Sequence, residues 1–247
     1  MLISANELNA LLKRVFEGMG YTPGHYEDAA ALVSWLQLHR EDGLGELERA
    51  LDLVADRDRR ASELVAEGPA TLIAECHGRS ALNCLPTLLE LACVQALEQG
   101  LIQVEIQHCH NRKFILKLLA DCAREGLWAQ VRWDNGHDPV RRHLARIEAG
   151  AAYPTYEEYR LPAHLPQTNR QSLTLLLGTP AHPQPAPEIE AAREIRCITP
   201  ADFALAREQA LENGTEISPA LWQRLNQLAE AVLVENSERS RSGAGGR

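Results

Sequence analysis

Hydrophobic residues recur at helical spacing through the first part of the chain. Ser4 and Glu7 have the spacing of a capping box, and an apolar stripe follows them at Leu8, Leu11, Leu12, Val15, Phe16 and Met19. We expect Gly20 to end this helix and Thr22-Pro23 to begin the next, as an N-cap followed by a first-turn proline. A further stripe follows a polar break, at Leu44, Leu47, Leu51 and Val54. The pattern predicts an N-terminal helical region over residues 1–60.

The period changes over residues 61–178. Residues 101–107 (LIQVEIQ) alternate apolar and polar side chains, as a half-buried strand does. Apolar runs predict further strands, and helical stripes that end at a glycine predict helices; the strands are expected at 71–76, 127–133 and 172–178, and the helices at 86–99 and 112–124. Strands that alternate with helices indicate crossover connections. We therefore predict an α/β fold with a mixed β-sheet core, crossover helices and a C-terminal helix.

The last third is less regular. Residues 150–170 carry prolines and tyrosines without periodicity, and we interpret residues 179–198 as a proline-rich linker. Thr199-Pro200 and Ser218-Pro219 each have the form of a cap followed by a first-turn proline, which predicts C-terminal helices within 199–236. The composition of residues 237–247, rich in Ser, Arg and Gly, predicts a flexible tail.

Composition is that of an ordinary globular protein, with 45% hydrophobic and 24% charged residues. The 25 basic and 34 acidic residues give a net charge of −9, which disfavours nucleic-acid and membrane partners. No apolar run approaches the ~20 residues that cross a bilayer. The first residues, MLISANELNALLKR, lack the charged start and apolar core of a signal peptide. We expect a cytoplasmic protein.

The six cysteines form no C-x-x-C pair, which disfavours zinc ribbons and thioredoxin-like redox motifs. Cys84, Cys93 and Cys122 lie among leucines in predicted helices. A free thiol in such a place behaves as a small hydrophobic group, so we expect these cysteines to be buried and reduced.

Two histidines end the alternating strand. On a continuing strand His108 and His110 would share a face, with Cys109 opposite. A metal site would also need Cys76 and His77, and the spacing of such a set is looser than that of structural zinc ligands. We therefore predict no metal site, and a histidine at a strand end more often holds a loop by a hydrogen bond.

Three basic residues each have two interpretations. Arg112 and Lys113 precede a predicted helix, where they would hold an anion or simply form a solvated helix end. Arg49 would bind a carboxylate ligand or pair on the surface with Glu46 or Glu48.

The motifs also follow a recognisable order. Two helices lead to a turn at 44–49, and the run GRSALNCLPTLLELACVQALEQGLIQVEI leads to the strand end His108-Cys109-His110-Asn111-Arg112. A helix, Gly126 and a strand that ends near Asn135 follow, and NGTEISPALWQRLNQLAE comes last. This order resembles the malate/L-lactate dehydrogenase family, the non-Rossmann NAD(P)-dependent oxidoreductases that include sulfolactate, ureidoglycolate and piperideine-carboxylate enzymes. The resemblance covers residues 4–51 and 75–136, and the tail resembles an uncharacterised bacterial offshoot of the family.

The resemblance implies roles for two residues and the sulfolactate-dehydrogenase-like fold. His110 falls on the histidine of the family's s-N-H motif, which exchanges a proton as hydride moves between nicotinamide and a 2-oxo acid or imine carbon. Arg49 falls on the arginine of S-H-G-x-x-R, which holds the substrate carboxylate. The family uses NAD or NADP and forms dimers, so the resemblance implies the same cofactors if the activity is retained. It also implies a homodimer. A further partner subunit is the alternative if the chain acts in assembly.

The sequence departs from the family at the positions that bind ligands. Leu44 and Gly45 stand where the first motif has Ser and His, and Lys113 follows the strand end where the family has small residues. The cofactor signature P-x-x-x-D-x-A-x-S has no counterpart, and only 136–198 remain for the segment that builds the nicotinamide site. We therefore predict a divergent, shortened relative that lacks the usual cofactor site and acts as a non-catalytic binding or assembly protein. The alternatives are a divergent oxidoreductase that uses His110 as acid/base, and a small-molecule or metal sensor based on the histidine cluster.

Overall fold

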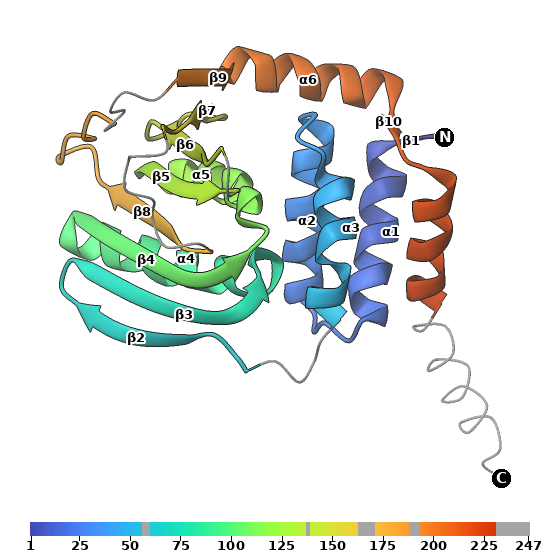
Figure 1. Cartoon of the computed structure of the whole chain (residues 1–247), viewed down its shortest axis with the longest axis horizontal. Helices are drawn as coiled ribbons and strands as arrows, with labels where there is room; N and C mark the ends of the chain where they lie inside the picture. Colours follow the sequence, from blue (N-terminus) through green and yellow to red (C-terminus); the bar gives the residue numbers. More distant parts are fainter. Residues whose placement is uncertain (56–59, 137–138, 163–170, 188–192, 231–247) are drawn as a thin grey trace, which may run out of the picture. The chain divides into compact units, whose positions relative to one another are not determined.

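The structure is a computed structural model, and it describes residues 1–55, 60–136, 139–162, 171–187 and 193–230. The chain divides into two compact units, one made of Met1–Leu51 with the chain from Ala206 onward, the other of Asp52–Leu205. Figure 1 labels the helices and strands of both units. Two helices cross the unit boundaries: α3 (Gly43–Ala55) and α6 (Pro200–Asn213). Each unit is described separately below.

The first unit is helical, as predicted. It contains α1 (Ala5–Gly18), α2 (His25–Leu38), most of α3 and a helical stretch at 219–230, and its short strands β1 (Leu2–Ile3) and β10 (Thr215–Glu216) pair antiparallel. The capping box is confirmed: the Glu7 amide donates to the Ser4 hydroxyl (3.2 Å) and the Ser4 amide donates to the Glu7 carboxylate (2.8 Å). The apolar stripe of α1 is buried at Leu8, Leu11, Leu12, Val15 and Phe16. Gly18 has no side chain, and this lets the Leu228 carbonyl lie against α1.

The predicted start of the second helix is wrong. Helix α2 begins at His25, and its N-cap is Gly24, which has a φ of 87° and no capping side chain. The Thr22 hydroxyl instead pairs with Nδ1 of His25 (2.9 Å). Only glycine adopts such a φ easily, so the chain turns at Gly24 and the helix starts after it.

The second unit is an α/β layer built on an eight-stranded sheet, counted over the described residues, with strand order β2-β3-β4-β8-β5-β6-β7-β9. Its helical elements are α4 (Ala81–Gln99), the one-turn η1 (Arg112–Phe114) and α5 (Ile115–Arg124). Its strands are β2 (Glu63–Gly68), β3 (Thr71–Ser80), β4 (Leu101–His110), β5 (Trp128–Asn135), β6 (Arg141–Ile147), β7 (Thr155–Arg160), β8 (Leu173–Gly178) and β9 (Arg193–Ile198). The predicted mixed α/β architecture is confirmed.

The connection β3–α4–β4 is the predicted parallel crossover. Strand β5, however, is not the neighbour of β4, because β8 lies between them and pairs antiparallel with both. Strands β3, β4 and β5 therefore point in the same direction. Helices α4 and α5 contact each other and cover the same face of the sheet (Figure 1). The core beneath them is apolar, with Ile102, Val104, Leu175, Leu177 and Val131 at most 1% exposed.

Four strands of the eight-stranded sheet were not predicted. Strand β2 has no buried position, and β9 has one, at Ile198, so neither shows an alternating pattern. Strand β9 also occupies the last part of the segment that we interpreted as a linker. Strand β6 buries His143, and β7 buries Glu157 and Glu158, so neither strand shows the usual alternation of apolar and polar residues. Helix α4 begins at Ala81, five residues before the predicted start, because the Ser80 hydroxyl caps it.

Within the described part of the chain, no helix has the length and apolar character needed to cross a bilayer. The predicted flexible tail at 237–247 lies outside the described residues, as do residues 231–236 of the predicted C-terminal helices.

Candidate functional site

Several polar side chains of the second unit lie at one edge of the sheet, meaning the edge formed by the strand ends. Strands β3, β4 and β5 all end at this edge, and the antiparallel β8 begins there. Ligands of open α/β sheets bind outside the carboxyl ends of the strands. His110, the last residue of β4, lies at this edge in register with Ser80, the last residue of β3.

Left-handed backbone conformations concentrate at the same edge. His77, His108, Asn111 and Gln171 have φ values of 51°, 47°, 55° and 70°. The Gln171 carbonyl accepts a hydrogen bond from the Cys109 amide (2.7 Å), which fixes the end of β4 against the start of β8. Non-glycine residues in this region of backbone space are strained, and such strain collects at functional sites.

A carboxylate joins the two strained histidines. The Glu75 carboxylate lies 2.7 Å from Nδ1 of His108 and accepts the backbone amide of His77 (2.6 Å), while Nε2 of His77 lies 3.2 Å from Glu63. Burial alone would raise the pKa of Glu75, but the hydrogen bonds from His108 and His77 lower it below its ordinary value. A carboxylate paired with imidazole is an arrangement suited to moving protons near neutral pH.

The left-handed residue His108 corrects one prediction. The alternation of β4 does not continue through His108, so the shared face predicted for His108 and His110 does not follow. Cys109 is fully buried in the core, and its thiol lies 3.6 Å from the His110 carbonyl. The shifted register also separates the roles of the two histidines, since the His108 ring is the one that pairs with Glu75.

Arg112 holds three strand ends together and is not the solvated helix end that the sequence allowed. The residue is 9% exposed, and its guanidinium donates to the Ser172 carbonyl, to the Asp134 carbonyl (3.2 Å) and to the Asn135 side chain. Burial lowers its pKa. These bonds tie the ends of β4, β5 and β8 together. The ammonium of the neighbouring Lys113 lies 5.9 Å from the centre of the Tyr156 ring, within the range of a cation–π contact.

Arg49 belongs to the first unit and His110 to the second. Arg49 lies on α3 with 57% of its side chain exposed, and its guanidinium contacts the carboxylates of Asp42 (3.1 Å) and Glu46 (2.9 Å). Leu44, at the position of the family serine, is only 4% exposed. The segment that resembles the family's carboxylate clamp is therefore neutralised by its own acids.

A buried polar network was missed by sequence analysis. Nδ1 of His143 lies 2.7 Å from the Tyr156 hydroxyl, which donates to Glu158 (3.1 Å), and Arg196 donates to the same carboxylate (3.3 Å). The His143 ring stacks on Trp133 at 4.8 Å, and burial lowers the pKa of His143 to about 4. If β6 and β7 had been predicted from the sequence, their pairing would have brought residues of this network together. The charged residues of both strands mask the apolar alternation that predicts a strand.

The helix starts at this end of the sheet are buried. A helix N-terminus with accessible backbone amides is one common site for a phosphate group. At the start of α4, Ser80, Ala81 and Leu82 are at most 2% exposed, and the Ser80 hydroxyl accepts a hydrogen bond from the Leu82 amide (3.3 Å). Phe114 and Ile115, where η1 passes into α5, are fully buried.

Comparison with solved structures identifies the fold. The chain is similar to a dehydrogenase from Sinorhizobium meliloti (12% identity, TM-score 0.66, 93% of this chain and 99% of that one) and to malate dehydrogenase from Pyrococcus horikoshii OT3 (12%, 0.67, 94% and 95%). It has the malate/lactate dehydrogenase fold. A third match is Δ1-piperideine-2-carboxylate reductase from Pseudomonas syringae pvar. tomato (14%, 0.60, 92% and 99%). The fold predicted from the motif order is confirmed.

At these identities the likeness shows the fold alone. A model of a family described as a protein of unknown function (DUF3726) matches residues 3–81. No curated protein matches the sequence.

Proposed function

We propose that this chain is a non-catalytic relative of the oxidoreductases with this fold and acts as a binding or assembly protein. The observation that carries the proposal is the engagement of Arg49 by Asp42 and Glu46. A substrate carboxylate would have to displace two carboxylates that belong to the same stretch of chain. Leu44 and Gly45 offer no side-chain donor that would help it. The buried helix starts of the second unit give no support to cofactor binding.

Exposed edge strands support the assembly role. In β2, Leu64 and Val65 are 40% and 61% exposed, and in β9, Ile195 is 44% exposed. Both strands lie at the ends of the sheet order, where backbone groups are available to pair with another chain. The dimers of the resembling family support a homodimer here, and a second protein subunit is the other partner that this role allows.

The test is a thermal-shift and turnover screen of the purified chain against NAD, NADP and their reduced forms, with and without 2-oxo acids and cyclic imines. A ligand at 100 times its Kd stabilises by about 2.7 kcal/mol, which shifts the melting temperature by several degrees. We expect no shift and no oxidation of NADH or NADPH, together with a stable oligomer in light scattering. A cofactor-dependent shift accompanied by turnover would overturn the proposal.

Variants of the acids around Arg49 sharpen this test. The Asp42→Ala/Glu46→Ala double variant frees the guanidinium and should gain affinity for small carboxylates if self-neutralisation is what blocks the clamp. The matched control is Asp52→Ala, which removes an exposed carboxylate from α3, the helix that carries Glu46 and Arg49. Equal behaviour of the double variant and the control would refute the argument from Arg49.

The second candidate is a divergent oxidoreductase that reduces a 2-oxo acid or a cyclic imine, with NAD or NADP as the expected cofactor. It is favoured by the position of His110 at the carboxyl edge of β4, beside the edge residues Glu75 and His108. Under this alternative His110→Ala abolishes turnover, while the exposed His25→Ala leaves it unchanged. An active His110→Ala enzyme would exclude His110 as the acid/base.

A further inference from the structure

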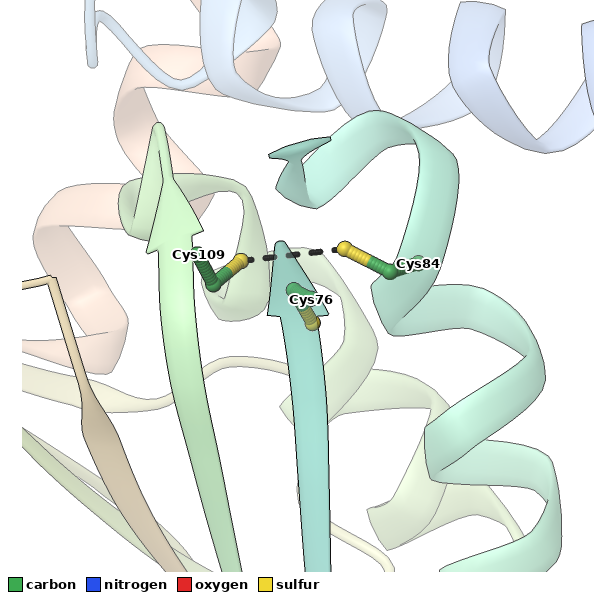
Figure 2. A group of neighbouring side chains, drawn as sticks. All are labelled: Cys76, Cys84 and Cys109. Carbon is green, nitrogen blue, oxygen red and sulfur yellow. Dashed lines mark hydrogen bonds between the residues drawn. The ribbon is translucent and has the colours of Figure 1, made fainter. Parts of the chain in front are cut away.

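Three cysteines from three different elements converge under α4. Cys76 lies on β3, Cys109 on β4 and Cys84 in the first turn of α4, and each is at most 1% exposed. Their Sγ atoms all lie within 4.8 Å of one another, and those of Cys84 and Cys109 are 3.8 Å apart. Figure 2 shows the thiols of Cys109 and Cys84 pointing toward one another, with Cys76 beside them.

The local fold brings these thiols together. The helix-facing positions of β3 are Leu72, Ala74 and Cys76, which are all buried. The left-handed His108 resets the alternation of β4, so Cys109 also enters the core. The Cys84 thiol donates to the Ser80 carbonyl (3.1 Å), which holds it at the base of the helix.

The spacing fits a metal ion held by sulfur. Thiolate–metal bonds of about 2.3 Å place two sulfurs around one ion roughly 3.8–4.0 Å apart. The Cys84–Cys109 distance already has this value, and pairs at the 4.8 Å limit would need to contract by about 1 Å. Within the described residues the group contains thiols alone, with no histidine or carboxylate as a fourth ligand. Zinc prefers four ligands in structural sites, whereas soft thiolates select cuprous copper, which accepts three.

We propose that Cys76, Cys84 and Cys109 form a buried trigonal site for cuprous copper, Cu(I). As the ion enters, each thiol releases its proton to solvent and forms one Cu–S bond, and the copper keeps its oxidation state. Two partly exposed imidazoles adjoin the cysteines along the chain, since His77 follows Cys76 and His108 precedes Cys109.

The test is an anaerobic titration of the reduced, metal-free full chain with Cu(I) in competition with the chelator bicinchoninate. We expect one tightly bound copper per chain. Cys84→Ser and Cys109→Ser should weaken binding on the order of 100-fold or more, at least the loss that follows removal of an outer-shell partner. The matched control is Cys122→Ser, which removes a thiol from the separate Cys93–Cys122 pair (3.3 Å) and should leave the affinity unchanged.

X-ray absorption of the wild-type copper complex keeps the proposal falsifiable even if a variant fails to fold. Three sulfur neighbours around copper are expected. Copper bound through nitrogen or oxygen, an equal loss of affinity in Cys122→Ser, or no copper retained against the chelator would each overturn the assignment.

Discussion

Asp134 and Arg142 form an ion pair near the end of β5. The free energy lost when this pair is removed can be calculated. Nε and Nη2 of Arg142 donate to the two carboxylate oxygens of Asp134 at 2.9 and 3.0 Å, and the side chains are 15% and 4% exposed. Asp134→Ala removes both charge-assisted bonds while the guanidinium stays largely out of water. Breaking a buried pair in this way costs about 3–5 kcal/mol. For a chain of this size the melting temperature should fall by roughly 6–20 °C.

Urea and thermal denaturation followed by circular dichroism measure the loss. The matched control is Glu27→Ala, which breaks the exposed pair between Lys13 and Glu27 (3.1 Å, side chains 38% and 56% exposed). Solvent screens that pair, so the expected change is about 0–1 kcal/mol. A loss for Asp134→Ala no larger than that of Glu27→Ala would refute the argument that burial makes the pair at the sheet edge strong.

Three further outcomes are expected. Burial lowers the pKa of His39 and of His143 to about 4, so between about pH 6.5 and 4 the unfolded chain binds protons that the folded chain does not, and the free energy of unfolding falls as the pH falls. His143→Gln should reduce the change in the free energy of unfolding across that pH window by on the order of 3 kcal/mol. An unchanged slope of this free energy against pH would contradict the burial argument. Leu175→Ala, at a fully buried position of β8, should cost about 2–5 kcal/mol in urea denaturation, against a negligible change for the half-exposed Leu211→Ala. Gly43→Ala would place a methyl group against the backbone of α2 and should destabilise by about 1–3 kcal/mol, whereas a neutral result would mean that the helices can separate there.

The sequence predicts elements well where one face is apolar and the other polar. Helix α1 and strand β4 were found because their stripes match the periods of a helix and a strand. Strand β2 was missed because all its residues except Gly68 are exposed. Strands β6 and β7 were missed because they bury residues such as Glu157 and His143, which single-sequence patterns assign to the surface.

The candidate site was predictable only in part. The end of β4 could be located, which puts His110 at the edge of the sheet. The contact of Glu75 with His108 depends on a left-handed residue that no spacing in the sequence reveals. Cys84 and Cys109 are 25 residues apart along the chain. Their convergence likewise depends on the packing of α4 on the sheet.

The position of β8 also has a consequence for how the chain folds. Leu101 of β4 pairs with Gly178, and Trp128 of β5 pairs with the same residue, so both strands wait for a partner that is made much later. As the chain is synthesised, β4 and β5 each have one side whose backbone groups stay unpaired until β8 emerges. Pairing over such separations is slow, and open edges are prone to join other chains. We expect the yield of native protein to depend on how quickly the segment up to Gly178 follows β5 out of the ribosome.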